Sequence, residues 1–518
     1  MPKGRIMFVT GERTLVCKSV KAHVLSMMAV SVMIIGVLSG CAVGPDFQSP
    51  KAPTAKAYTA EMLPVETEGA PGIAGAAQRF AAGKDIPGEW WTLLHSEELD
   101  QLIRQALADS PTVAAAKARL READENRRAQ YGSLFPVADA NISASRQKIS
   151  GAGFGQPESD ISAFNLYNAS VNVSYALDLF GGTRRKLEAL QSQIDHQRFQ
   201  LEGVYLTLTS NIVTTAVKEA SLRAQIGAMR QIIEAQEKQL KVVEEQFRLG
   251  GVPRSDVLAQ RAQLAQTQAV LPPLEKQLAQ TRHQLAVLAG RLPSEAALPE
   301  FDLSDFDLPE ELPVSLPSLL VRQRPDIRAA EEVLHAASAQ VGVSTANLYP
   351  QITLTGSFGL QASTVGDLLN SSAAIWSLGA GVLQPIFHGG ELTAKRRAAI
   401  AVYDQALAQY RDTVLQAFQS VADVLRALAG DASTLKAQAE AEAAARDTLD
   451  LTEKQFQLGA VGYLSLLNAE RQYEQARLGL VQAQAVRFAD TAALYQALGG
   501  GWWNRNPKAE AAAEMKAE

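Results

Sequence analysis

The chain has 518 residues, enough for a large core or an extended assembly, and a mildly acidic net charge of −6. This charge balance argues against a nucleic-acid partner. Only 20% of the residues are charged, while Ala and Gln are abundant, and such a composition favours long helices.

The N-terminal region resembles a bacterial export signal. Basic residues precede an apolar run at 29–38, which leads into Leu-Ser-Gly-Cys ending at Cys41. This tetrapeptide resembles the lipobox of bacterial lipoproteins, in which the cysteine is acylated and becomes the new N-terminus. A plain transmembrane anchor is the alternative, although the apolar run is short for a span of about 20 residues. In this class Ala42 after the cysteine, rather than Asp, favours sorting to the outer membrane.

The cysteine content limits the chemistry of the mature chain. The other cysteine, Cys17, lies in the leader, so acylation of Cys41 would leave neither a disulfide nor a cysteine metal site. After residue 41 no apolar stretch is long enough to span a bilayer as a helix. Any part of the chain that crosses a membrane would therefore use strands or the lipid.

The first half predicts helices, two strands and a long helical hairpin, in that order. Apolar residues and Ala recur at helical spacing over 99–130, and Pro136 ends this part because proline lacks the backbone donor of a helix. Apolar and polar residues then alternate, which is the period of a strand. The predicted elements are strands at about 137–146 and 169–180, a helix of roughly 100 Å over 183–249, a turn at Gly250 and Gly251, and a return helix over 257–290.

The second half repeats this order, with Pro350 in the place of Pro136. The repeated elements are strands at about 351–361 and 374–387, a long helix over 391–458, a turn at Gly459 and a return helix over 466–498. Helices of this length cannot pack within one globular core, so we expect partner helices along their length, as in a coiled coil or an α-helical barrel.

The predicted organisation follows from these elements. It comprises a lipoprotein signal peptide at 1–40, an irregular lipid-anchored tether at 41–88, a first repeat at 89–292, a proline-rich linker at 293–323, a second repeat at 324–503 and a tail at 504–518.

The strands predict an oligomer. Each repeat offers two strands, and the four strands of one chain cannot close a barrel, while an open sheet edge cannot face lipid. Alternation of apolar with small polar residues is typical of a sheet with lipid on one face and water on the other. Three chains would supply twelve strands, enough for a water-filled lumen. We therefore predict an α+β protein with a duplicated repeat, whose long helical hairpins form a trimeric α-barrel continuous with a 12-stranded transmembrane β-barrel. A soluble β-sandwich with helical arms is the alternative.

Several short motifs follow one another along the chain. They are Cys-Ala-Val-Gly-Pro-Asp-Phe at 41–47, Trp90-Trp91, Arg-Pro-Asp-Ile at 324–327, Pro-Ile-Phe at 385–387 and a Phe-x-Leu-Gly turn in each repeat. In this order they resemble the TolC-like outer-membrane efflux channels, especially their lipoprotein branch, over essentially all of 41–503. The resemblance implies a homotrimer in outer-membrane lipid, with the linker and chain ends in an equatorial region. It also implies a periplasmic adaptor (membrane fusion) protein at the helix tips and an inner-membrane pump that supplies energy.

The resemblance further implies functional residues at the two helix turns. The adaptor would dock at Leu249, Gly250, Val252, Leu458, Gly459 and Val461, although such glycines also occur in ordinary helix turns. In the family the pore narrows just inside the tip, and Asp256 matches the gate aspartate of the first copy. Three Asp256 carboxylates around a threefold axis would form a cation-attracting ring, and a helix N-cap is the alternative role.

The second copy departs from the family at its gate. Ser465 and Asn468 stand where many members carry aspartates, and Val461 replaces an arginine or another polar residue. Packing of Tyr463 and Leu464 could close the pore there instead. The predicted gate residues are Arg254, Asp256, Tyr463, Leu464, Ser465 and Asn468.

These features predict the outer-membrane channel of a tripartite efflux pump, a passive conduit that carries small molecules such as drugs out of the periplasm. The sequence has no nucleotide-binding loop and no hydrolase elbow, and its six histidines are not at zinc spacing, so we expect no catalytic residue, cofactor or metal site. The alternatives are a type I protein secretion exit duct and a non-conducting structural envelope lipoprotein. The sequence does not name the substrate.

Overall fold

The computed structural model describes residues 42–148, 163–295 and 297–505. The predicted signal peptide, Cys41 and nearly all of the predicted tail lie outside the described residues. The chain divides into two compact units. The sheet unit comprises the segment up to Gln48, Asp124–Ser192 and His335–Gln405, and the helical unit comprises Ser49–Ala123, Gln193–Leu334 and the chain from Ala406 onward.

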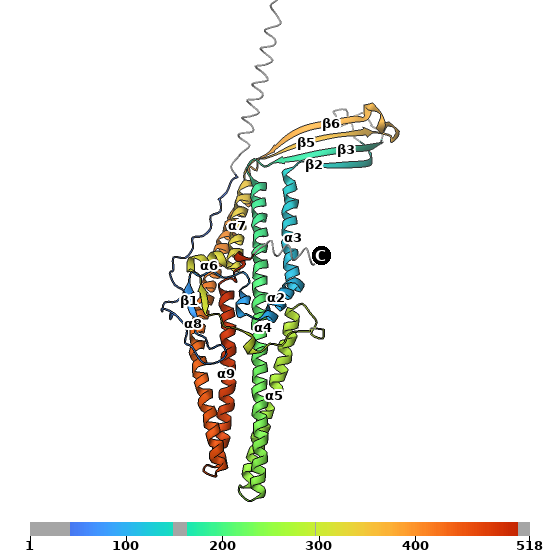
Figure 1. Cartoon of the computed structure of the whole chain (residues 1–518). Coiled ribbons are helices and arrows are strands. Elements are labelled where there is room, and N and C mark those ends of the chain that lie inside the picture. Colours follow the sequence, from blue (N-terminus) through green and yellow to red (C-terminus); the bar gives the residue numbers. More distant parts are fainter. Residues whose placement is uncertain (1–41, 149–162, 296, 506–518) are drawn as a thin grey trace, which may run out of the picture. The chain divides into compact units, whose positions relative to one another are not determined.

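The sheet unit contains an antiparallel sheet of four strands in the order β2-β3-β5-β6 (Figure 1). Its strands are β2 (Val137–Gln147), β3 (Phe164–Leu177), β5 (Gln351–Ala362) and β6 (Ala374–Leu383). Strand β3 begins earlier than the alternation predicted, because its pairing with β2 continues to Phe164 opposite Gln147. Strand β6 ends before the predicted residue 387, because Pro385 has no N–H to donate to a neighbouring strand.

Two hairpins of long helices dominate the helical unit (Figure 1). The first joins α4 (Gly182–Arg248) to α5 (Arg254–Leu288), and the second joins α8 (Glu391–Gln457) to α9 (Tyr463–Ala497). Helices α4 and α8 each have 67 residues, and α5 and α9 each have 35. The other α-helices of the described residues are α2 (Glu97–Asp109), α3 (Pro111–Tyr131), α6 (Pro317–Gln323) and α7 (Pro325–Ala346).

A short parallel pair, absent from our prediction, lies in the helical unit. Strand β1 (Arg79–Ala82) pairs with β4 (Glu311–Val314), so part of the predicted irregular tether is a strand that pairs within the predicted linker. The tether is also partly buried, since Ile86 and Gln78 are inaccessible to solvent. Strands of four residues carry too little alternation to be recognised, and their pairing depends on contacts between distant segments.

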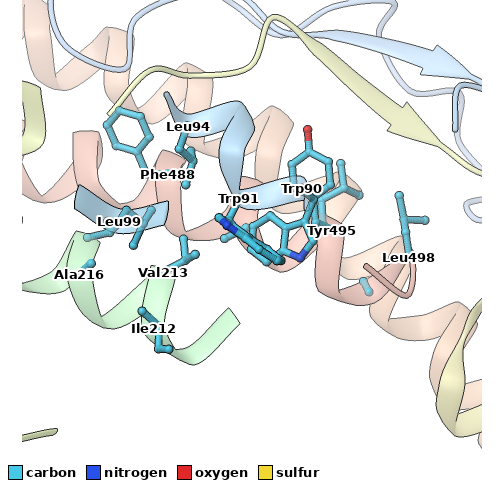
Figure 2. Packing of buried hydrophobic residues seen from close by; sticks show 14 of the residues in the cluster. Trp90, Trp91, Leu94, Leu99, Ile212, Val213, Ala216, Phe488, Tyr495 and Leu498 are labelled. Atoms are coloured by element: carbon cyan, nitrogen blue, oxygen red, sulfur yellow. The ribbon is translucent and has the colours of Figure 1, made fainter. Parts of the chain in front are cut away.

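The core of the helical unit forms around Trp90 (Figure 2). The Trp90 ring stacks on Tyr495 of α9, with centroids 5.2 Å apart and an angle of 14° between the ring planes. Its neighbour Trp91 donates from Nε1 to Asp100 of α2 at 2.9 Å, so the buried indole keeps a hydrogen bond. Buried aliphatic residues such as Leu99 and Ile212 come from α2 and α4, and the core therefore ties the start of the first repeat to the end of the second.

A cluster of buried polar side chains lies beside this core. Arg487 of α9 is fully buried and donates from Nη2 to Gln78 at 2.9 Å and to Thr67 at 3.1 Å. Asp431 of α8 lies close to both Asp490 of α9 and this arginine. Burial and the neighbouring Asp490 raise the pKa of Asp431 to about 7, so one carboxyl of this pair holds a proton near neutral pH.

Among the described residues, no helix combines the length and apolarity needed to cross a bilayer.

Candidate functional site

The four-stranded sheet has one apolar and one polar face. In one row across the sheet, residues that stand opposite each other are Ala140, Val171, Phe358 and Trp376. The adjacent row, which points to the other face because side chains alternate along a strand, comprises Asp139, Asn172, Ser357 and Ser377. The hydroxyls of Ser357 and Ser377 are 2.8 Å apart and hydrogen-bonded.

Large apolar side chains on the first face are exposed in the single chain. Ile142 of β2 is 87% exposed and Trp376 of β6 is 77% exposed. A water-soluble sheet would cover such side chains with a second layer, so this face suits a lipid environment while the other face suits water.

The segment after Cys41 is docked onto the sheet unit. The Val43 N–H donates to the carbonyl of Phe180 at 3.1 Å, and Arg185 of α4 pairs with Asp46 at 2.6 Å. The ring of Phe47 stacks on His335 of α7 with centroids 4.3 Å apart. The motif at 41–47 thus has a structural role that its sequence alone did not indicate: Asp46 and Phe47 attach the chain to two helices.

Glycine allows the closest approach in this docked segment. Gly44 has φ +104°, a conformation that other residues rarely adopt, and a Cβ built on it would lie 2.4 Å from the Cα of Gly342. A Cβ on Gly181 would lie 2.5 Å from the Cβ of Ala42. Ala42 therefore lies against the turn that follows β3, and Cys41, which is outside the described residues, directly precedes it.

Both hairpins turn at a glycine in the left-handed region. Gly250 has φ +77° and Gly459 has φ +71°, and the preceding leucines, Leu249 and Leu458, are exposed. Val252 and Val461 are partly buried against a small apolar cluster of the tips, which we call the tip core. The tip core consists of Val243, Val257, Phe456, Tyr463, Leu466 and Leu467. The six predicted docking residues thus form two equivalent tips.

Asp256 lies in the first turn of α5. The N-cap of that helix is Pro253 and no side chain forms a cap hydrogen bond, so the N-cap alternative for Asp256 is wrong. Asp256 still suits this position, because a carboxylate in the first turn interacts favourably with the helix dipole. It accepts a hydrogen bond from the Ser255 hydroxyl at 3.1 Å, and the exposed Arg254 is the first residue of the helix.

The predicted gate residues of the second copy divide into two groups. Leu464, Ser465 and Asn468 are exposed. Tyr463 is instead buried in the tip core, where its hydroxyl donates to Oε1 of Gln260 on α5. Burial raises the pKa of the Tyr463 phenol, so it remains a donor throughout the physiological range. Its ring therefore packs between the two hairpins of its own chain.

Polar contacts that we did not predict continue this junction between α5 and α9. Arg471 donates from Nε to Oε1 of Gln263 at 2.6 Å, and the Thr267 hydroxyl donates to Glu474 at 3.3 Å. Together with Tyr463–Gln260 they form three cross-hairpin contacts. A sequence signal existed, since Gln260, Gln263 and Thr267 are spaced by three and four residues and thus share one helix face. Polar residues on a face are usually assigned to solvent, and these three are buried.

Comparisons with known proteins agree with this geometry. The family model described as "Outer membrane efflux protein" matches residues 102–291 and 316–500. The pyoverdine export outer membrane protein OpmQ of Pseudomonas putida is 33% identical over 431 residues, covering 81% of this chain and 89% of that protein. The cation efflux system protein CusC of Escherichia coli O6:H1 is 27% identical over 471 residues, covering 90% of this chain and 96% of that protein.

A solved structure of an outer-membrane channel has the same fold as this chain. The outer-membrane channel OprN superposes with a TM-score of 0.80 at 29% sequence identity, covering 89% of this chain and all of that one. The family model matches each repeat separately, as the duplicated elements require. The chain therefore belongs to the outer membrane efflux protein family, and it is an outer-membrane efflux channel rather than an enzyme.

Proposed function

We propose that three copies of the chain form one conduit through the outer membrane, closed by strand pairing between copies. The observation that supports this proposal is the two-faced sheet, in which β2 and β6 are the outer strands. Backbone groups at a sheet edge cannot remain unpaired in lipid. Pairing of β2 in one copy with β6 of the next would satisfy both edges and place the polar rows toward the lumen.

We also propose that Cys41 carries the acyl anchor. The docked segment supports this, because Ala42 lies beside Gly181 and Val43 bonds to Phe180, just after β3. An acyl chain on the preceding residue would then leave the protein close to the strands that we place in lipid.

The two tips are proposed as the docking site of a periplasmic adaptor, which links the channel to an inner-membrane pump. The exposed Leu249 and Leu458 beside the turn glycines support this role, because apolar side chains at the end of a hairpin offer an anchor to a partner helix. The names of the relatives specify pyoverdine export and cation efflux, so cargo differs within the family. We propose that this channel passes small molecules that the pump selects.

The proposed gate is tested by single-channel conductance of the purified protein in planar bilayers, with wild type beside Asp256→Ala. Removal of the carboxylate ring should raise a small wild-type conductance. Asp447→Ala, at an exposed position of α8, is the control and should leave conductance unchanged. A conducting wild type with an unchanged Asp256→Ala variant would discard the gate and keep the channel. Absence of conductance from all three correctly inserted proteins would contradict the conduit and favour a structural envelope protein.

A further inference from the structure

A cavity of about 210 Å³ lies between α4, α8 and α9 in the helical unit. None of the predicted gate or docking residues lines it, although its wall residue Leu449 packs against the tip core, and the function proposed above assigns nothing to it. Part of its wall is apolar, including Ile232 of α4 and Leu449 of α8. The polar part of the wall includes Gln236 of α4, Glu453 of α8 and Glu470 of α9.

Two buried polar side chains on this wall lack protein partners for some of their atoms. Gln236 is only 2% exposed, and neither its amide nitrogen nor its amide oxygen has a hydrogen-bond partner among the described residues. Glu470 is 6% exposed, and its Oε2 also has no partner there. An unpaired buried polar atom costs roughly 1–3 kcal/mol. A ligand that donates hydrogen bonds into this cavity would offset that cost.

The charges on the cavity wall determine which kind of hydrogen-bond donor the cavity favours. Glu453 and Glu470 supply two carboxyl groups. Arg477 is the one cation among the described wall residues. Its Nη1 lies 3.6 Å from the carboxylate of Glu442, a residue that does not line the cavity. An anion would be repelled by the two carboxyls, whereas an ammonium group gains charge-assisted hydrogen bonds.

The volume and the apolar wall set the size of the ligand. A cavity of about 150 Å³ admits benzene, so a somewhat larger one can hold a single ring with a short polar arm. The ring of Tyr473 also lines the cavity, and a tyrosine face attracts cations. We propose that this cavity binds a small organic monocation, with its ammonium group at Glu470 and Gln236 and its apolar body against Ile232 and Leu449.

Binding of such a cation should be linked to proton release. Burial raises the pKa of Glu470 to about 7, and burial followed by the charge of Asp450 raises the pKa of Glu453. A bound cation favours the ionised carboxyl, so affinity should increase as pH rises through about 7 while the amine stays protonated. Glu470 interacts with Gln260 of α5, Glu453 of α8, and Glu474 and Tyr463 of α9. The other polar groups on the cavity wall are Gln231 and Gln236 of α4 and Tyr473 and Arg477 of α9.

The proposal is tested by isothermal titration calorimetry of the purified full chain in detergent. The probes are benzylammonium chloride and its neutral counterpart benzyl alcohol, each measured at pH 6 and pH 8. We expect saturable binding of benzylammonium that is tighter at pH 8 than at pH 6 and tighter than the binding of benzyl alcohol. Proton release should appear as a binding enthalpy that changes with the ionisation enthalpy of the buffer. Calorimetry does not depend on conduction, so its outcome tests the cation site independently of the proposed conduit.

Matched variants locate the site. Glu470→Gln should weaken benzylammonium binding by about tenfold or more, because it removes a charged hydrogen-bond partner. Glu474→Gln, one turn along α9, is the comparison: its carboxyl is half-buried and bonds to Thr267 of α5 instead of lining the cavity, so binding should change much less than in Glu470→Gln. Ala228→Leu fills the cavity without altering charge and should abolish binding. Absence of saturable binding, equal affinity for benzyl alcohol, or full binding by Glu470→Gln would each overturn the proposal.

Discussion

Asp431 shows how a single buried carboxyl couples stability to pH. Its folded-state pKa of about 7 lies above the usual 3.8, because burial and Asp490 disfavour its charge. The native state therefore binds this proton more tightly than the unfolded chain does. The resulting stabilisation is fully present below about pH 4 and is lost as pH rises to about 7.

We predict that Asp431→Asn, which imitates the protonated carboxyl, is more stable than wild type, and by a larger margin at pH 8 than at pH 5. The difference should be at most about 4 kcal/mol, the equivalent of the full pKa shift. Thermal unfolding midpoints at the two pH values measure it. Asp423→Asn, at an exposed position of the same helix, should follow wild type at both. Identical pH profiles for wild type and Asp431→Asn would rule out this coupling.

Sequence patterns located several of the important residues but not their contacts. The Phe-x-Leu-Gly repeats identified Gly250 and Gly459 because a left-handed turn requires glycine at a fixed place after a helix. The same reasoning could not place the Tyr463 hydroxyl on Gln260, because that contact joins two hairpins about 200 residues apart. Likewise Gln236 and Glu470 look like solvent-facing helix residues, and only the packing of three helices buries them.

The turn of the second hairpin allows a test of how much local backbone geometry contributes to the stability of a helical hairpin. Gly459 has φ +71°, whereas Gly462 has φ −79°, and a Cβ would meet no atom within 4 Å at either position. Alanine at Gly459 therefore adds backbone strain, whereas alanine at Gly462, the N-cap of α9, only replaces a better cap residue. We predict that Gly459→Ala destabilises the protein by about 1–2 kcal/mol, while Gly462→Ala costs about 0.5 kcal/mol or less.

Thermal unfolding midpoints of the two glycine variants beside wild type provide the measurement. The two variants can be compared directly, because both residues are exposed and belong to the same turn region. An equal loss in both variants would indicate that chain entropy or the preceding helix, rather than the left-handed turn, controls this tip.

Elements with long regular patterns were predictable, while their starting points were less so. The prolines and glycines bounded α4 and α8 to within a residue or two. The return helices α5 and α9 begin three residues earlier than predicted, at Arg254 and Tyr463. Their N-caps are Pro253 and Gly462, which form no side-chain cap hydrogen bond, so the usual Ser, Asp or Asn signal of a helix start is missing.

The two faces of the sheet matter for the assembled molecule. Ile142 belongs to the apolar face and its neighbour Ser143 to the polar face of the same strand. We predict that Ile142→Arg reduces insertion and trimer yield, because a charge facing lipid costs about 2 kcal/mol or more near the bilayer midplane. Ser143→Arg should assemble normally, because its side chain would face water, and should shift ion selectivity toward anions.

The yield of heat-modifiable trimer in outer-membrane fractions checks the first expectation, and reversal potentials in a salt gradient check the second. Ser143→Arg serves as the matched control, since it introduces the same side chain one residue away. A lower yield for Ser143→Arg than for Ile142→Arg would mean that the two faces are oriented opposite to our assignment.

The equal lengths of corresponding helices in the two repeats restrict how this protein can change in size. With 67 residues in both long helices and 35 in both return helices, neither repeat can be shortened alone without leaving its turn at a different height. Loss of seven residues from each of the two helices of one hairpin would displace its end by about 10 Å relative to the other hairpin. Insertions and deletions in the ancestry of this duplicated gene are therefore expected to be accepted when they change all four helices of the two hairpins by the same length. The length of each half then constrains the length of the other.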